Sequence, residues 1–110
     1  MKEGRRIVCI NGVPVNTEKE IVENENVNLA VYAGSTGLCG GGRREGGRTY
    51  VSLENKGAAD MIATLVTDKD GNGTGFEIAA SGDAELVSLA YAFAAVSATL
   101  LDSIAGEDGE

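Results

Sequence analysis

Apolar and polar residues alternate with a period of two in short stretches of the first 80 residues, and this spacing is typical of half-buried β-strands. The alternation is clearest over residues 27–33 and again over 48–54, on either side of a stretch in which half the residues are glycine. The runs 61–67 and 74–80 are joined by the turn-forming segment 68–73 and predict a β-hairpin. We therefore expect a small antiparallel sheet of about five strands.

The first strands of this sheet are expected to include one at an edge. A β-branched run ends at Asn11-Gly12, the strongest short hairpin signal, and Pro14 follows it. Proline has no N–H to donate to a neighbouring strand, so Pro14 predicts an edge position for the returning strand. Residues 16–28 are rich in Asn and Glu and predict a solvated edge strand or loop.

The last part of the chain changes to helical spacing. Ser81 or Asp83 can cap a helix, Glu85 falls in the first turn where the helix dipole favours an anion, and Gly106 predicts the end. One apolar stripe is expected to pack on the sheet: Leu86, Leu89, Phe93, Val96, Leu100 and Ile104. The predicted fold is therefore α+β, a single domain over 1–110 with a β-rich part at 1–80, one long helix at 81–106 and an acidic tail at 107–110.

The opposite side of this helix is also apolar. It carries Ala90, Ala94, Ala98, Leu101 and Ala105, with few polar residues between them. A helix that is apolar almost all round is either engulfed or shared with a partner, and a domain of this size can hardly engulf it. We expect a homo-oligomer with the helix at its interface. A membrane span is not expected, because the apolar run 86–101 is shorter than the roughly 20 residues that cross a bilayer and acidic residues flank it.

Composition narrows the function. The chain carries 17 Asp and Glu against 9 Lys and Arg, a net charge of -8, which disfavours binding of duplex nucleic acid. It has no histidine, so the commonest general base and the usual zinc ligand are missing and an enzyme is not expected. The two cysteines, Cys9 and Cys39, without a preceding signal segment favour a cytoplasmic protein with reduced thiols. No cofactor and no metal site is predicted.

The glycine-rich loop at 34–47 is the leading candidate for a site. Its second half and the residue after it, 40–48, concentrate three of the nine basic residues beside glycines that can turn backbone N–H groups toward an anion. Arginine forks match phosphate oxygens, and Tyr50, with Tyr32 as a further candidate, offers a stacking surface for a base. The predicted ligand-binding residues are Gly40, Gly41, Gly42, Arg43, Arg44, Gly46, Gly47, Arg48 and Tyr50. Two other interpretations stay open for this loop: a flexible surface hairpin and a docking finger for a protein.

The segment 68–73 also fits the opening of a calcium loop, with oxygen ligands at alternate positions and glycine sixth. The twelfth position, where a bidentate glutamate should close the coordination shell, is Ala79. A hairpin turn is therefore the favoured identity of this segment.

A small acidic chain with the loop 36–50 and a C-terminal helix opening Gly82-Asp83-Ala84-Glu85-Leu86-Val87 resembles accessory proteins encoded by phages and prophages. It is similar in plan to the signal sponges that counter Thoeris and cyclic-oligonucleotide defences. The resemblance implies a small oligomer in a bacterial host that sequesters a nucleotide messenger without cleaving it, and it transfers no site residue.

The predicted function is thus non-enzymatic binding of a phosphate-bearing small ligand, with a nucleotide immune signal as the first candidate. One alternative is an acidic inhibitor of a nucleic-acid-binding defence enzyme, resembling an anti-CRISPR protein, that imitates phosphates with the acids at 18–25. The other is a structural oligomeric subunit that binds nothing small.

Overall fold

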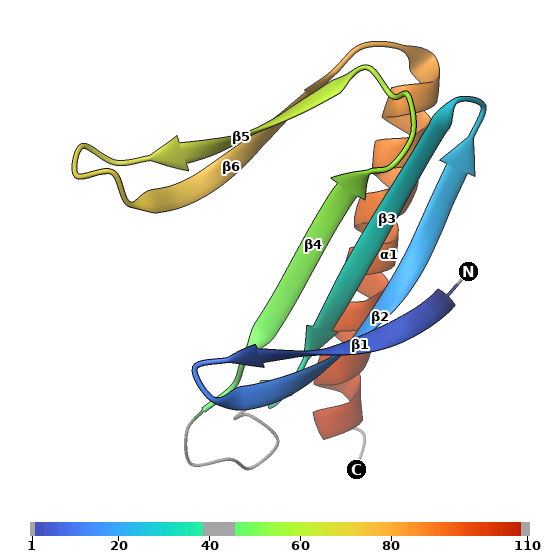
Figure 1. Ribbon diagram of the computed structural model, residues 1–110. Helices are drawn as coiled ribbons and strands as arrows, with labels where there is room; N and C mark the ends of the chain where they lie inside the picture. Colours follow the sequence, from blue (N-terminus) through green and yellow to red (C-terminus); the bar gives the residue numbers. More distant parts are fainter. Residues whose placement is uncertain (1, 39–45, 109–110) are drawn as a thin grey trace.

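The computed structural model describes residues 2–38 and 46–108, with side chains over 4–38 and 46–105. The described residues form two antiparallel sheets and one helix (Figure 1). The larger sheet has the order β1-β2-β3-β4, and the smaller one pairs β5 with β6. The elements are β1 (Lys2–Ile10), β2 (Val13–Asn24), β3 (Val27–Ser35), β4 (Thr49–Asn55), β5 (Met61–Thr67), β6 (Gly73–Ala80) and α1 (Asp83–Asp108). The α+β class and the helix on the sheet are confirmed, with six strands in two sheets.

The β1-β2 hairpin forms where Asn11-Gly12 predicted it. Both turn residues have positive φ, 49° at Asn11 and 83° at Gly12, as a two-residue hairpin turn requires. Pro14 pairs with Cys9 of β1 and lies in a part of β2 that has no partner on its other side, because pairing with β3 begins at Glu18. The edge position of Pro14 is therefore confirmed locally.

The expectation of a solvated edge strand or loop at residues 16–28 is wrong in part. β2 runs through to Asn24, and Glu18 to Glu20 pair with both neighbouring strands. A two-residue turn at Glu25-Asn26, with φ 56° at Glu25, leads directly into β3. The alternating glutamates favour a solvated strand, but the middle of β2 is paired on both sides, whereas residues 16–17 pair with β1 alone and residues 21–24 with β3 alone.

The first half of β2 bends across the face of the sheet at Gly34 of β3. A Cβ at Gly34 would lie 2.9 Å from the Cα of Thr17 and 3.0 Å from the carbonyl carbon of Asn16, which no side chain tolerates. Glycine thus permits β2 to leave its ladder with β3, and β1 crosses in front of the sheet with it (Figure 1). The bend buries Val13, Val15 and Thr17 against the sheet.

α1 lies along the other face of the sheet, mainly over β3 and β2. The core is formed by Val27, Leu29 and Val31 of β3 with Ala92 of the helix. Ser88 and Ala92 are the helix residues that are fully buried, and Ala92 belongs to the core against β3. Small side chains at this contact allow the helix backbone to approach the sheet closely.

The predicted sheet-facing stripe of the helix is therefore wrong in part. Leu89 and Val96 do pack against the core, but Leu86, Phe93 and Ile104 are exposed. The helix has turned its small residues inward and several of its large apolar residues outward. It also continues through Gly106 to Asp108, two residues beyond its predicted end.

This helix is long and apolar enough to cross a membrane by length and composition alone. Within its 23-residue stretch Asp83–Ala105, the most apolar window has a mean hydropathy of 1.7, and 11% of that window is buried inside the protein.

Candidate functional site

Five of the nine predicted ligand-binding residues fall outside the residues that the structure describes: Gly40, Gly41, Gly42, Arg43 and Arg44. The other four lie at the start of β4 and in the segment before it: Gly46, Gly47, Arg48 and Tyr50.

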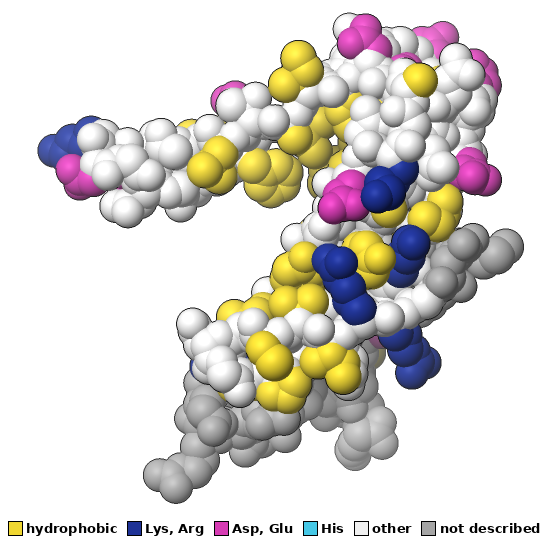
Figure 2. All heavy atoms as spheres, in the orientation of Figure 1, with side chains coloured by type: hydrophobic (Ala, Val, Ile, Leu, Met, Phe, Trp, Pro, Cys, Tyr) yellow, Lys and Arg dark blue, Asp and Glu magenta, His cyan; other side chains and the backbone are white. Residues whose placement is uncertain are grey.

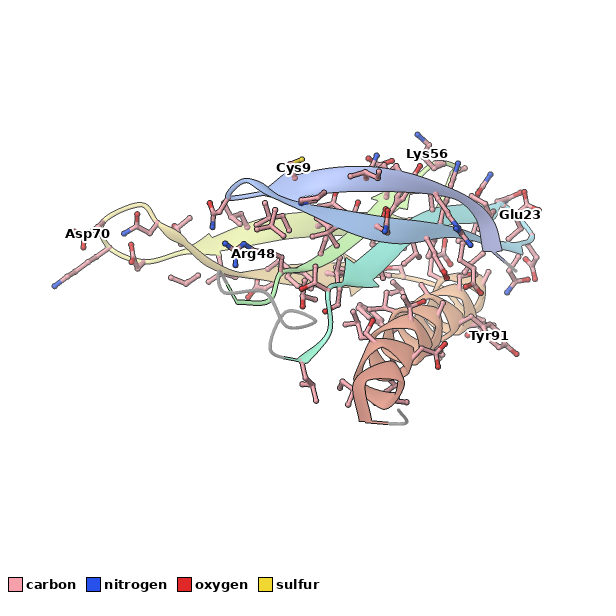
Figure 3. The ribbon with its side chains drawn as sticks, turned by 90° about the horizontal axis from the view of Figure 1, so that it is seen from below. Cys9, Glu23, Arg48, Lys56, Asp70 and Tyr91 are labelled. Carbon is pink, nitrogen blue, oxygen red and sulfur yellow. The ribbon has the colours of Figure 1, made fainter. Side chains whose placement is uncertain are left out.

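Arg48 is held where the chain re-enters the sheet (Figure 3). Its Nε donates to the carbonyl oxygen of Ile10 at 3.0 Å, and its Nη1 donates to the carbonyl oxygen of Gly47 at 3.2 Å. Its backbone N–H donates to Thr36 Oγ1, and its carbonyl accepts from the Thr36 N–H, both at 3.0 Å. Arg48 thus connects the β1-β2 turn to both ends of the glycine-rich loop. Part of its guanidinium is therefore engaged in hydrogen bonds that stabilise the fold.

Tyr50 belongs to a cluster on the face of the sheet that α1 leaves open. Its hydroxyl accepts a hydrogen bond of 2.9 Å from Arg6 Nη2. The Arg6 guanidinium lies 3.8 Å from the centroid of the Tyr32 ring and 5.8 Å from that of Tyr50. The Lys19 ammonium lies 5.9 Å from the Tyr32 centroid. We call these four residues, Arg6, Lys19, Tyr32 and Tyr50, the basic-aromatic cluster.

The register of the sheet brings the cluster together from four strands. Lys19 of β2 stands opposite Tyr32 of β3, and Arg6 of β1 stands opposite Thr17. Tyr50 of β4 pairs with Gly34, where the missing side chain leaves room for β1 and β2 to bend over the sheet. Figure 2 shows Lys and Arg side chains gathered around apolar ones on this face of the molecule.

The cluster is suited to hold an anion attached to a flat ring. Arginine has five N–H donors in a planar fork, and the exposed Arg6 donates one of them to Tyr50. A cation over a tyrosine ring is favourable in itself by about 0.5–1 kcal/mol at an exposed site. The half-buried Tyr32 and Tyr50 add aromatic surface beside two positive charges, in a protein whose net charge is -8.

Sequence reasoning included Tyr50 and considered Tyr32, but it missed Arg6 and Lys19. The residues opposite Arg6 and Lys19 follow from the strand register, once β2 is recognised as one strand between two tight turns. A turn at Asn11-Gly12 sets Arg6 opposite Thr17, and a turn at Glu25-Asn26 sets Lys19 opposite Tyr32. The missed signal was the second turn.

The segment 68–73 forms a turn, as its sequence favoured. Asp68 Oδ1 accepts from the backbone N–H groups of Asp70 and Asn72, both at 2.9 Å. The hydrogen bond from Asn72 is the main reason that the pKa of Asp68 lies below its usual value. Across residues 2–38 and 46–108, no three His, Cys, Asp or Glu side chains come together in a group that could hold a metal ion.

The acids at 18–25 do not form one surface. Side chains alternate between the faces of a strand, so Glu18 and Glu20 lie on the side of α1 and Glu23 on the open side. Glu18 lines a polar pocket with Asp102 and Ser103 of the helix. Phosphate imitation by this segment stays a prediction, but the alternation divides its charge between two faces.

The fold and the cluster define a small α+β protein in which one helix covers one face of an antiparallel sheet and basic and aromatic side chains gather on the other. Comparison with known proteins adds no relative: no protein family, no characterised protein and no solved structure matches this chain.

Proposed function

We propose that this chain is a non-enzymatic, oligomeric protein that binds and sequesters a phosphate-bearing small ligand at the basic-aromatic cluster, with a nucleotide signal as the first candidate. The observation that carries the proposal is the Arg6 guanidinium, stacked on Tyr32 at 3.8 Å and hydrogen-bonded to Tyr50 at 2.9 Å, on an exposed face.

Each residue has a role in this proposal. Arg6 directs its remaining donors to phosphate oxygens, and Lys19 adds a second positive charge on the same face. Tyr50 supports the ring of the ligand by stacking, and Tyr32 holds the Arg6 guanidinium in place. Arg43 and Arg44 remain predicted phosphate ligands, on a loop that ends next to the strand carrying Tyr50.

Binding rather than turnover is proposed because the cluster offers charge and aromatic surface without a general base. Arginine stays protonated at physiological pH, and histidine is absent from the whole sequence. Such a site holds a ligand in its initial chemical form, which is what a sequestering protein requires.

Isothermal titration calorimetry against a panel of cyclic and linear nucleotides tests the proposal. Arg6→Ala should weaken binding by about 1.5–3 kcal/mol, the usual size of a hydrogen bond to a charged group, or roughly 10- to 150-fold in Kd. Arg5→Ala is the matched control, because Arg5 is exposed and neighbours Arg6 but points to the other face of β1.

Two results would contradict this function. If no nucleotide of the panel gives heat or raises the melting temperature, the ligand class is wrong. If Arg5→Ala and Arg6→Ala weaken binding equally, general charge attraction rather than the cluster is responsible.

A structural subunit is the second candidate, and the exposed apolar side of α1 favours it. Leu86, Tyr91 and Leu101 are each more than half exposed. This candidate predicts assembly into oligomers with no response to any nucleotide.

A further inference from the structure

The β5-β6 hairpin, which we call the arm, has three cross-strand pairs of apolar residues on one face, between its base and Thr67. Pairing across the arm is Met61 with Ala80, Ala63 with Ile78 and Leu65 with Phe76, and these pairs share one face. Leu65 and Phe76 are both 65% exposed. The other face is mixed and includes Thr64 and Glu77. The alternation is that of a half-buried hairpin, yet the protomer leaves the outer part of this apolar face, Leu65 and Phe76, uncovered.

The arm is anchored at its base and extends away from the rest of the molecule (Figure 1). Asp60 donates its N–H to Glu85 Oε2 at 2.9 Å, and its carbonyl accepts from Ser81 at 3.0 Å. Met61, the first residue of β5, packs against the core. A two-stranded hairpin alone is marginally stable in water, so the outer part of the arm needs a surface to pack on.

A second uncovered apolar surface lies on the side of α1 toward β4. Leu86, Phe93 and Ile104 are spaced by two and three helical turns and are all exposed. Ile104 lines a groove with Leu38 and Thr49, which places this stripe beside β4, where Val51 is also exposed. We call these four residues, Leu86, Phe93, Ile104 and Val51, the helix flank.

The amount of uncovered surface is large for a chain of this size. The radius of gyration is 15.5 Å, whereas a compact domain of 110 residues has about 13 Å. The accessible surface is 7099 Å², about 1,400 Å² more than the roughly 5,700 Å² of a compact monomer of this mass. A standard interface takes about 800 Å² from each partner, so the excess is enough to form one.

We infer that a second copy of this chain covers both surfaces, with the apolar face of each arm packed on the helix flank of the other copy. A two-fold pair buries both surfaces at once, because each copy offers an arm and receives one. This inference deepens the assembly part of the proposed function and does not depend on its ligand.

Charge favours a second copy over a lipid surface as the occupant. The apolar arm face and the helix flank carry no charged residue, so two acidic chains can meet there without bringing like charges into contact. Cellular membranes are anionic at the cytoplasmic surface and attract basic segments. The first turn of α1 carries Asp83 and Glu85, and no basic residue lies in its last turn.

Sedimentation equilibrium of the full chain tests the arm contact. Leu65→Asp should raise the dimer Kd by at least about 100-fold, because each dimer loses two buried leucines worth about 1.5–3 kcal/mol each. Ile62→Asp is the matched control, since Ile62 is 68% exposed on the same strand but faces the opposite side of the arm. A monomeric wild type at 100 μM overturns the inference, as does a Leu65→Asp variant that dimerises like the wild type.

Cross-linking separates arm exchange from a dimer of helices alone. Leu65→Cys and Phe93→Cys chains of different tags, each with Cys9→Ser and Cys39→Ser, should form a disulfide between the two kinds of chain when mixed and oxidised. Mixed Ile62→Cys and Phe93→Cys chains should not. Equal yields from both mixtures overturn the inference, and so does flotation of the wild type with anionic vesicles in place of self-association.

The ligand titration distinguishes this inference from the rest of the proposed function. Leu65→Asp should retain nucleotide binding while it loses self-association. Self-association without any nucleotide response would support the arm contact and contradict the proposed nucleotide ligand. Nucleotide binding by a monomeric wild type would support the ligand and contradict the arm contact.

Discussion

Replacing Gly34 with alanine should damage the fold more than any other conservative change at a glycine of the sheet. The added Cβ would lie 2.9 Å from the Cα of Thr17 and 3.0 Å from the carbonyl carbon of Asn16. Ordinary contacts of a Cβ are several tenths of an ångström longer, and both neighbours are backbone atoms that cannot rotate away. The first half of β2 would have to lift from the sheet.

The loss of stability in Gly34→Ala can be estimated from the residues that the bend of β2 buries. Val15 and Thr17 are fully buried beneath it, and the Thr17 hydroxyl donates to the carbonyl oxygen of Arg6 at 2.8 Å. Overpacking usually costs about 1–3 kcal/mol, and a clash with backbone belongs at the upper end of that range. At about 4–8 °C per kcal/mol, the melting temperature should fall by roughly 10–20 °C.

Thermal unfolding followed by circular dichroism at one fixed protein concentration measures this loss. Gly75→Ala is the control, because its Cβ would meet only Val66 Cβ at 3.9 Å, an ordinary contact. That variant should be neutral or slightly stabilising, since alanine restricts the unfolded chain. A Gly34→Ala protein that melts within about 2 °C of the wild type would refute the close crossing of β2 over β3.

Two further predictions concern the loop and the arm tip. Arg48→Ala should lower the free energy of unfolding of the ligand-free protein by about 1.5–3 kcal/mol in chemical denaturation, because the Arg48 guanidinium donates hydrogen bonds to the Ile10 and Gly47 carbonyls. An unchanged free energy of unfolding would contradict this structural role and leave only the predicted role in ligand binding. The turn at Asp68 should loosen in acid: its pKa is lowered in the folded arm, so its stabilising effect is present above the unfolded pKa near 3.8 and is lost as pH falls through the lower folded value. Hydrogen exchange at the Asp70 and Asn72 amides, corrected for intrinsic rates, should lose protection across that interval, and Asp68→Asn should remove this pH dependence; equal protection at pH 5 and pH 2 in the wild type would contradict the assignment.

The sequence predicted local structure well where the signal was local. Asn11-Gly12 specified the first hairpin, the segment 68–73 specified the second, and the helix begins at Asp83 as its capping residues indicated. β2 was misread because glutamates at alternate positions look the same on an edge as in an interior strand. Pairing on both sides of Glu18 to Glu20 depends on a turn that neither glycine nor proline marks.

The candidate site was predicted only in part for the same reason. Tyr50 lies close to the loop in sequence, whereas Arg6 is 44 residues from Tyr50. Arg6 reaches Tyr50 because the first half of β2, with β1 paired to it, crosses over Gly34. Such a bend depends on one close contact between distant strands. The spacing of residues within a single segment therefore does not predict this bend.

The sequence did not predict which side of α1 faces the sheet, and this orientation bears directly on function. Helical periodicity gives the angle between residues but not which side meets the sheet, and this helix has apolar residues on nearly every side. Ser88 and Ala92 face inward, where small side chains let the helix backbone approach the sheet closely. Three of the large side chains that this leaves outside, Leu86, Phe93 and Ile104, belong to the helix flank, on the face of the sheet opposite the basic-aromatic cluster. A partner bound at the helix flank would therefore leave Arg6 and Tyr50 open to a ligand, so assembly and binding can occur in the same molecule without competing for surface.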